Sequence, residues 1–154
     1  MIKKFFHQFA SPKSYFAIAN KFGKPVLAIF FLLYIGALVW GLFFTPPDAV
    51  QGDSYRIIYM HVPASFMAQI LFVVMAITSA VFLIWKLKLA AYVSKSIAPI
   101  GAIVTFFALF SGSIWGIPTW GTWWQWDARI TSTLILFIMY LGLISLHASF
   151  ENKD

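Results

Sequence analysis

Residues 66–85 read FMAQILFVVMAITSAVFLIW, an apolar run interrupted only by Gln69, Thr78 and Ser79. A helix needs about 20 predominantly apolar residues to cross the hydrocarbon core of a lipid bilayer. The run therefore predicts a membrane-spanning helix, and the residues before it extend the predicted span to 55–85.

Three further segments, 25–44, 97–114 and 128–146, have the length and composition of membrane spans. The first would begin at Pro25, because the first turn of a helix has no intrahelical partner for the N–H that proline lacks. The chain is 61% hydrophobic and only 10% charged, whereas soluble domains carry about 25% charged residues. We therefore predict an all-α fold, a polytopic transmembrane bundle of four spans that forms a single membrane domain over residues 1–154.

Basic residues are distributed unevenly between the two ends of these spans. The N-terminal tail, the loop after the second span and the C-terminal tail hold nine of them, namely Lys3, Lys4, Lys13, Lys21, Lys24, Lys86, Lys88, Lys95 and Lys153. The other side holds only Arg56 and Arg129. Cytoplasmic loops carry an excess of Lys and Arg, so we expect both termini in the cytoplasm and the loop at 115–127 outside.

The residue types that are missing exclude several classes of function. The sequence has no cysteine, which excludes disulfides, thiolate metal sites and a C-x-x-C-H attachment motif. We find no nucleophile–base pair, carboxylate pair or glycine-rich phosphate loop, so we expect no enzymatic activity. We also expect no nucleic-acid partner.

Tryptophans are concentrated in the stretch WGIPTWGTWWQWDAR at 115–129. Five of the chain's seven lie there, namely Trp115, Trp120, Trp123, Trp124 and Trp126. Tryptophan is common at membrane interfaces, and Trp40 and Trp85 at predicted span ends need no other explanation. An interfacial belt needs fewer rings at one helix end, so the cluster indicates a surface for a large flat ligand or for the apolar face of another protein.

The predicted geometry of this cluster depends on where the chain becomes helical again. We expect an external loop at 115–127 that turns helical near Thr122, after a turn shaped by Gly112, Gly116, Pro118 and Gly121. Trp120, Trp123 and Trp124 would then share one helix face. That face would be a platform for a ligand.

Asp127 and Arg129 each have two possible roles. Asp127 would lie on the predicted tryptophan face, but it could equally be the N-cap of the fourth span, its carboxylate accepting backbone N–H bonds. Arg129 could be an interfacial residue with its charged end in water, or it could bind a ligand carboxylate through its planar guanidinium.

A histidine is the second polar feature near the same predicted side of the membrane. It belongs to the stretch SYRIIYMHVPAS at 54–65, where His61, Ser65 and Gln69 follow at i, i+4 and i+8 and form one stripe on a helix. An ionisable group inside a span is a candidate functional residue, although a single histidine is more often a hydrogen-bonded structural residue. Imidazole is also the usual protein ligand of haem iron. His7 and His147 are weaker candidates because both lie toward the other side.

The stretches WGTWWQWDAR at 120–129 and SYRIIYMHVPAS at 54–65 resemble the haem-handling protein family, membrane proteins with a tryptophan-rich signature on an external loop. The resemblance covers essentially the whole chain, including IAPIGAIVTFFALFSGSIWG at 97–116. It implies a protein of the bacterial inner membrane that holds haem b non-covalently at the periplasmic face and presents it to a periplasmic haem chaperone for cytochrome c maturation. ATP-binding cassette transporter subunits of the same system would be further partners, beside haem and the lipid bilayer.

The resemblance also implies roles for individual residues. His61 would be an axial ligand of the haem iron. The haem platform and chaperone contact would consist of Trp115, Trp120, Trp123, Trp124, Trp126 and Asp127. A cation, Arg56 or Arg129, would meet a haem propionate.

The resemblance implies six spans and a second external histidine after the fifth, whereas this chain ends at Asp154, after the fourth. We therefore expect it to be the N-terminal part of a longer protein, the alternatives being that a separate chain supplies the rest or that one histidine holds the iron. Three other functions stay open. The first is a haem-free scaffold whose tryptophans dock a periplasmic partner, and the second is a b-type cytochrome or quinone-binding membrane subunit. The third, a channel or transporter, is disfavoured because charged residues are missing at mid-span.

Overall fold

The computed structural model describes residues 11–151. In chain order its elements are α2 (Pro12–Phe43), the short 3-10 helix η1 (Asp53–Ile57), α3 (Ile58–Trp85), α4 (Lys88–Trp120) and α5 (Ala128–Glu151). The four α-helices are long and apolar enough to cross a membrane, and the described residues contain no strand. The predicted all-α bundle of four spans is confirmed.

The first helix begins earlier than predicted. It starts at Pro12 with Ser11 as its N-cap, whose side chain accepts a hydrogen bond from the backbone N–H of Ser14. A serine cap followed by proline is a strong start signal, and Pro25 lies inside the helix instead of at its beginning. The apolar run at 25–44 marks the part that can lie in lipid, while the helix extends beyond it.

The third helix, α4, is much longer than the predicted span at 97–114. It continues through Pro118 and ends at Trp120, where Gly121 takes a left-handed conformation with φ 72°. The N–H of Gly121 donates to the carbonyl of Ile117 at 3.0 Å, as expected of a glycine that closes a helix. The predicted loop at 115–127 is therefore wrong in its first half, and the connection to α5 is only residues 121–127.

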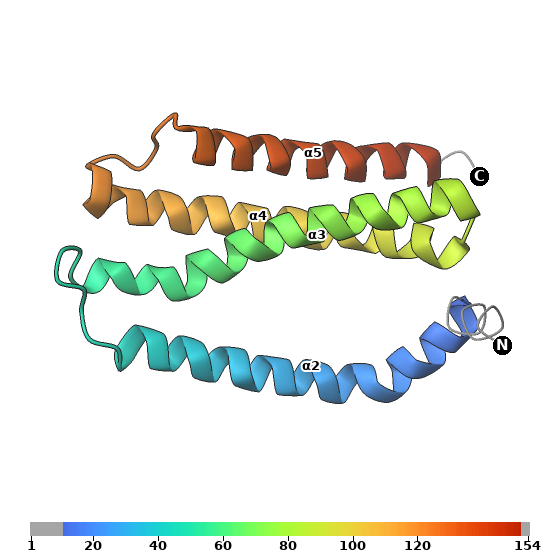
Figure 1. The fold of residues 1–154 in the computed structure, drawn as a ribbon, viewed down its shortest axis with the longest axis horizontal. Helices are drawn as coiled ribbons and strands as arrows, with labels where there is room; N and C mark the ends of the chain where they lie inside the picture. The colour runs from blue at the N-terminus through green and yellow to red at the C-terminus, as the bar shows by residue number, and fades with distance from the viewer. Residues whose placement is uncertain (1–10, 152–154) are drawn as a thin grey trace.

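Figure 1 shows α3, α4 and α5 lying side by side, with α2 along the other side of α3. The connection at 44–52 and the loop at 121–127 lie at the same end of the molecule, which we call the tryptophan end. The start of α2, the turn between α3 and α4 and the last turn of α5 lie at the opposite end. That turn is tight because Lys86 adopts a left-handed conformation with φ 54°.

The basic residues follow this division between the two ends. Those toward the opposite end, on α2, α4 and the α3–α4 turn, are Lys13, Lys21, Lys24, Lys86, Lys88 and Lys95, whereas Arg56 and Arg129 lie at the tryptophan end. Lys3, Lys4 and Lys153 are outside the described residues. Which end faces the cytoplasm stays a prediction.

The packed core lies between α3, α4 and α5. Its buried members are Met75, Ile97, Ala98, Ala102 and Tyr140. The ring of Tyr140 is fully buried and lies directly on Gly101, where a Cβ atom would overlap it. Its hydroxyl donates to the carbonyl of Ala68 at 3.0 Å, so one side chain of α5 contacts α4 and α3 together.

The helix α2 is attached to the rest of the bundle at the tryptophan end. Arg56 donates to the backbone carbonyls of Leu42 at 3.1 Å and Thr45 at 2.9 Å. Carbonyls at a helix C-terminus have no intrahelical partner, so this guanidinium satisfies that of Leu42 and also the carbonyl of Thr45 just beyond the helix. Nearby, the ring of Tyr59 lies against Gly41, where a Cβ atom would be 2.5 Å from the ring.

Candidate functional site

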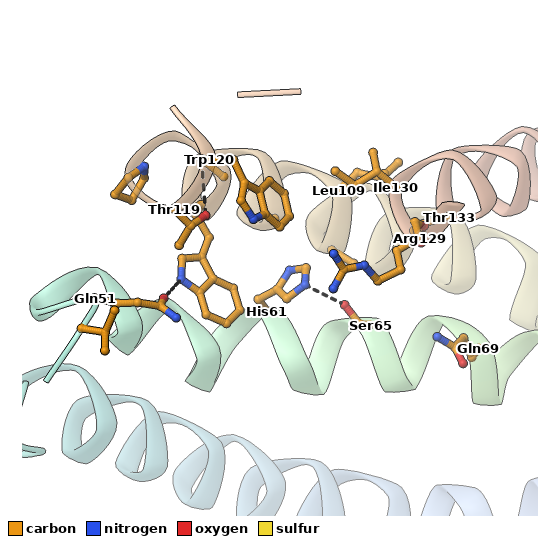
Figure 2. A pocket seen from close by; sticks show the side chains of 16 residues that line it. Gln51, His61, Ser65, Gln69, Leu109, Thr119, Trp120, Arg129, Ile130 and Thr133 are labelled. Atoms are coloured by element: carbon orange, nitrogen blue, oxygen red, sulfur yellow. Dashed lines mark hydrogen bonds between the residues drawn. The ribbon is translucent and has the colours of Figure 1, made fainter. Parts of the chain in front are cut away.

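A cavity of about 660 Å³ opens at the tryptophan end between α3, α4 and α5. This volume lies within the range of small-molecule sites, about 300–1,000 Å³. Its polar lining residues include Gln51, His61, Ser65, Gln69, Thr119, Arg129 and Thr133. Figure 2 shows Trp120 and Arg129 on the side facing the α3 residues His61, Ser65 and Gln69. The predicted polar stripe of α3 therefore faces the cavity.

The imidazole of His61 is held between α3 and α4. Its Nδ1 lies 3.1 Å from Ser111 Oγ and its Nε2 lies 3.3 Å from Ser65 Oγ. The ring reaches α4 only because residue 112 is glycine, since a Cβ atom there would lie 2.8 Å from His61 Cε1. Two serines and a glycine thus fix the position of the ring.

Trp115 forms the wall beside this histidine. Its indole Nε1 donates to Gln51 Oε1 at 2.8 Å, which ties α4 to the segment before η1. The indole meets the imidazole of His61 edge to face, with ring centroids 5.7 Å apart at 70°, and it meets the ring of Tyr55 edge to face with centroids 6.5 Å apart. The ring is therefore oriented by its neighbours before any ligand arrives.

Trp120 and Arg129 form the opposite wall. The guanidinium carbon of Arg129 lies 5.7 Å from the centroid of the Trp120 ring, a cation–π distance. Arg129 also donates through Nε and Nη2 to a single oxygen of Asp127, at 3.2 and 3.0 Å. A guanidinium has five N–H donors, so Arg129 has donors left for a ligand carboxylate.

The other three tryptophans lie apart from His61. Trp123 and Trp124 line a second groove of about 400 Å³ between α4 and α5, whose other lining residues are apolar except for Ser113. Trp126 is 75% exposed and packs edge to face on Trp124 at 5.5 Å. The prediction that Trp120, Trp123 and Trp124 share one helix face is wrong, because α4 ends at Gly121 and residues 121–127 are not helical.

Asp127 is the N-terminal cap of α5. Its Oδ1 accepts the backbone N–H of Ile130 at 2.9 Å, as the capping interpretation of the sequence predicts. This hydrogen bond and the Arg129 guanidinium lower the pKa of Asp127 below its ordinary value. Asp127 thus determines where α5 begins and where Arg129 points.

Two of the sequence candidates lie away from the cavity. Arg56 is not among its lining residues, and its guanidinium binds the end of α2 and forms an ion pair with Asp53 at 3.2 Å. A propionate contact for Arg56 stays a prediction. His147 lies in the last turns of α5, at the opposite end, and His7 is outside the described residues.

Sequence reasoning missed three residues around His61, namely Gln51, Ser111 and Gly112. Gly112 was expected to shape a turn, but it lies inside α4, where it admits the imidazole. The signal that could have found two of these positions is the small pair Ser111–Gly112 in a helix that neighbours a histidine-bearing one, because small residues allow membrane helices to approach closely; no signal of this kind marks Gln51.

The model of the Heme exporter protein C family matches residues 5–154. The chain belongs to this family. The family resemblance predicted from the tryptophan motif is therefore confirmed.

Individual relatives agree with this assignment. The chain is 45% identical over 152 residues to Heme exporter protein C of Escherichia coli K12, and 43% identical over 152 residues to that of Haemophilus influenzae. It is 42% identical over 147 residues to the protein of the same name from Rhodobacter capsulatus. These alignments cover 97%, 98% and 96% of this chain and 61% of each relative, so the chain spans about three fifths of their length.

The membrane location follows from the helices and the family together. Four helices of the described chain can span a bilayer, and the relatives from Haemophilus influenzae and Escherichia coli are bacterial proteins named Heme exporter protein C. This member of the Heme exporter protein C family is a multi-pass protein of the inner membrane.

Proposed function

We propose that this chain holds haem in transit at the periplasmic face of the inner membrane and presents it to a periplasmic haem chaperone for the maturation of c-type cytochromes. The cargo would be haem b, bound without a covalent bond. One observation carries the proposal: His61 lines a cavity whose other walls are Trp115, Trp120 and Arg129. The names of the relatives support it.

The residues around the cavity suit haem in three respects. A neutral imidazole is the usual protein ligand of haem iron, and His61 lines the cavity. Indole rings such as those of Trp115 and Trp120 offer large apolar faces at low entropic cost. Arg129 can donate to a propionate, since charge-assisted bonds between guanidinium and carboxylate groups are among the strongest hydrogen bonds in proteins.

Each residue has a separate role in this proposal. His61 binds the iron, and Trp115 keeps the imidazole in place by its edge-to-face contact. Trp120 and Arg129 cover part of the porphyrin, with the guanidinium aimed at a propionate. Arg56, the other candidate cation, would need to leave the carbonyls of Leu42 and Thr45 to take the same role.

The loop tryptophans suit contact with a partner protein. Trp123 is 65% exposed and Trp126 is 75% exposed, and exposed aromatic side chains are typical of interfaces. We propose that they meet the haem chaperone, with Asp127 at the edge of the contact. ATP-binding cassette subunits would act next to this chain, on the loaded chaperone.

The proposed activity is binding and transfer of haem, not catalysis. The cavity is partly open to its surroundings, and an exposed site releases its ligand faster than an enclosed one, which suits a protein that must give up its cargo. The excess of lysine toward the opposite end supports a cytoplasmic location for that end and a periplasmic one for the cavity.

The test is the absorption spectrum of the detergent-purified chain from haem-replete cells, compared with those of His61→Ala and His147→Ala. We expect a Soret band in the parent and in His147→Ala, because His147 lies about 30 Å along α5 from the cavity end of that helix. His61→Ala should lose the band. A band of equal strength in His61→Ala would remove His61 from the ligand role.

A haem-free scaffold is the second candidate, favoured by the exposure of Trp123 and Trp126. It predicts a colourless parent protein that still binds the chaperone through these rings. A b-type cytochrome subunit is less favoured, since His61 and His147, the two histidines of the described chain, lie at opposite ends of the bundle. The spectrum and a chaperone pull-down with Trp126→Ala separate these functions.

A further inference from the structure

The hydroxyl of Ser111 has only one hydrogen, and its neighbours indicate where that hydrogen goes. Ser111 is 2% exposed, and its Oγ lies 2.8 Å from the carbonyl oxygen of Phe107 and 3.3 Å from that of Ala108. A carbonyl oxygen can only accept. The Ser111 hydrogen is therefore directed at these backbone carbonyls of α4.

The same oxygen lies 3.1 Å from Nδ1 of His61. With its hydrogen on a carbonyl, Ser111 Oγ can only accept from the imidazole, so Nδ1 must carry the proton. The contact on the α4 side of the imidazole thus requires an N–H at Nδ1.

We infer that Ser111 is a positioning residue that holds His61 in the Nδ1–H tautomer, with the lone pair at Nε2. This inference rests on the proposed function, because it assigns Nε2 as the atom offered to iron. A histidine that binds a metal almost always donates its other ring N–H to an acceptor, which fixes the tautomer and the orientation of the ring. Ser111 supplies that acceptor from the neighbouring helix.

The other side of the ring agrees with this assignment. Ser65 Oγ lies 3.3 Å from Nε2, and Figure 2 shows this contact along α3 at the edge of the cavity. Ser65 can donate to a lone pair at Nε2, and this long hydrogen bond is weak. Among the described residues, Ser65 is the hydrogen-bond partner that iron would have to displace from Nε2.

Gly112 makes the arrangement possible. A Cβ atom at this position would lie 2.8 Å from Cε1 and 3.3 Å from Nδ1 of His61, so a larger residue would push the ring away from Ser111. The pair Ser111–Gly112 therefore provides both the acceptor and the space that the imidazole needs.

The first experiment reads the tautomer without haem. His7 and His147 are replaced by Gln so that His61 is the only histidine, and ¹⁵N NMR of the haem-free protein reports which ring nitrogen carries the proton. We expect Nδ1–H in this parent and a loss of that preference in Ser111→Ala. A proton on Nε2 in the parent, or an unchanged preference in Ser111→Ala, would overturn the inference.

The second experiment measures haem affinity by titration of the full chain in detergent. Ser111→Ala should bind haem about 10–100-fold more weakly than the parent, the usual effect of removing such a partner. Ser113→Ala, a serine of α4 that does not line the cavity, is the matched control for folding and should keep the parent affinity. Equal affinity in Ser111→Ala would contradict the positioning role. A parent that binds no haem would overturn the proposed function, while the NMR result would still decide the tautomer.

Discussion

Two aromatic side chains lie on glycines of the same helix, at different heights of the bundle, and they have opposite surroundings. Tyr140 lies on Gly101 and is fully buried, with its hydroxyl on the carbonyl of Ala68. His61 lies on Gly112 and borders a cavity of about 660 Å³. The same packing of a ring against a glycine therefore serves the core in one place and the candidate binding site in another.

This difference in surroundings predicts how the Tyr140–Gly101 and His61–Gly112 contacts respond when the ring is displaced. A close-packed interior transmits a volume change to all its neighbours, so displacing Tyr140 disturbs three helices. His61 can turn into its cavity, so displacing it should affect ligand binding more than stability.

Gly101→Ala should have the largest effect on stability. The new Cβ would overlap the ring of Tyr140, which has no free space, and overpacking of this kind costs about 1–3 kcal/mol. The measurement is reversible unfolding in detergent by SDS titration. Gly142→Ala is the matched control, because a Cβ there meets nothing within 4 Å and alanine favours the helix by about 1 kcal/mol. Equal stability of the two variants would mean that Tyr140 is not enclosed as described.

Gly112→Ala should have a smaller effect on stability and a large one on haem. The Cβ would meet the imidazole of His61 at 2.8 Å, but the ring can move, so we expect a loss below about 1 kcal/mol. Haem affinity should fall at least about tenfold, since the imidazole leaves the acceptor that orients it. Unfolding and haem titration of the same preparation check both parts. A stability loss equal to that of Gly101→Ala would erase the distinction between the two glycines.

The smallest effect is expected at Asp127, which touches neither ring. The pKa of Asp127 is lowered by the Ile130 N–H and the Arg129 guanidinium, so its charged form stabilises the folded chain. That contribution is complete above the unfolded-state pKa of an aspartate and is lost as the pH falls through the lower folded value. Asp127→Asn keeps a capping group but cannot titrate. Its stability should therefore fall less than that of the parent when thermal unfolding is followed into the acid range.

The number and type of the helices could be predicted from the sequence, but their ends could not. Apolar runs show which residues tolerate lipid, and they do so well for α3. They do not show where a helix stops, since α2 continues through Pro25 and α4 through Pro118. Helix ends depend on local caps, here Ser11 and Gly121.

The candidate site was predictable only in part for a similar reason. His61, Ser65 and Gln69 share a stripe that follows from helical spacing alone, and all three line the cavity. The separation of Trp120 from Trp123 follows from a single backbone conformation at Gly121 and has no periodic signal. Contacts between helices, such as the one between residues 61 and 111, are 50 positions apart and require the three-dimensional packing.

The tight turn at Lys86 also makes the distances along α3 and α4 from the turn to His61 and to Ser111 important. His61 lies 24 residues before the end of α3 at Trp85, and Ser111 lies 23 residues after the start of α4 at Lys88. Each of these two helix segments rises about 35 Å from the turn to the site. His61 and Ser111 therefore lie at the same height because the two segments contain nearly the same number of residues. Deleting one residue from either helix segment would shift His61 or Ser111 along the helix axis by about 1.5 Å and rotate it by about 100°. The two helix segments can therefore vary in composition but not in length.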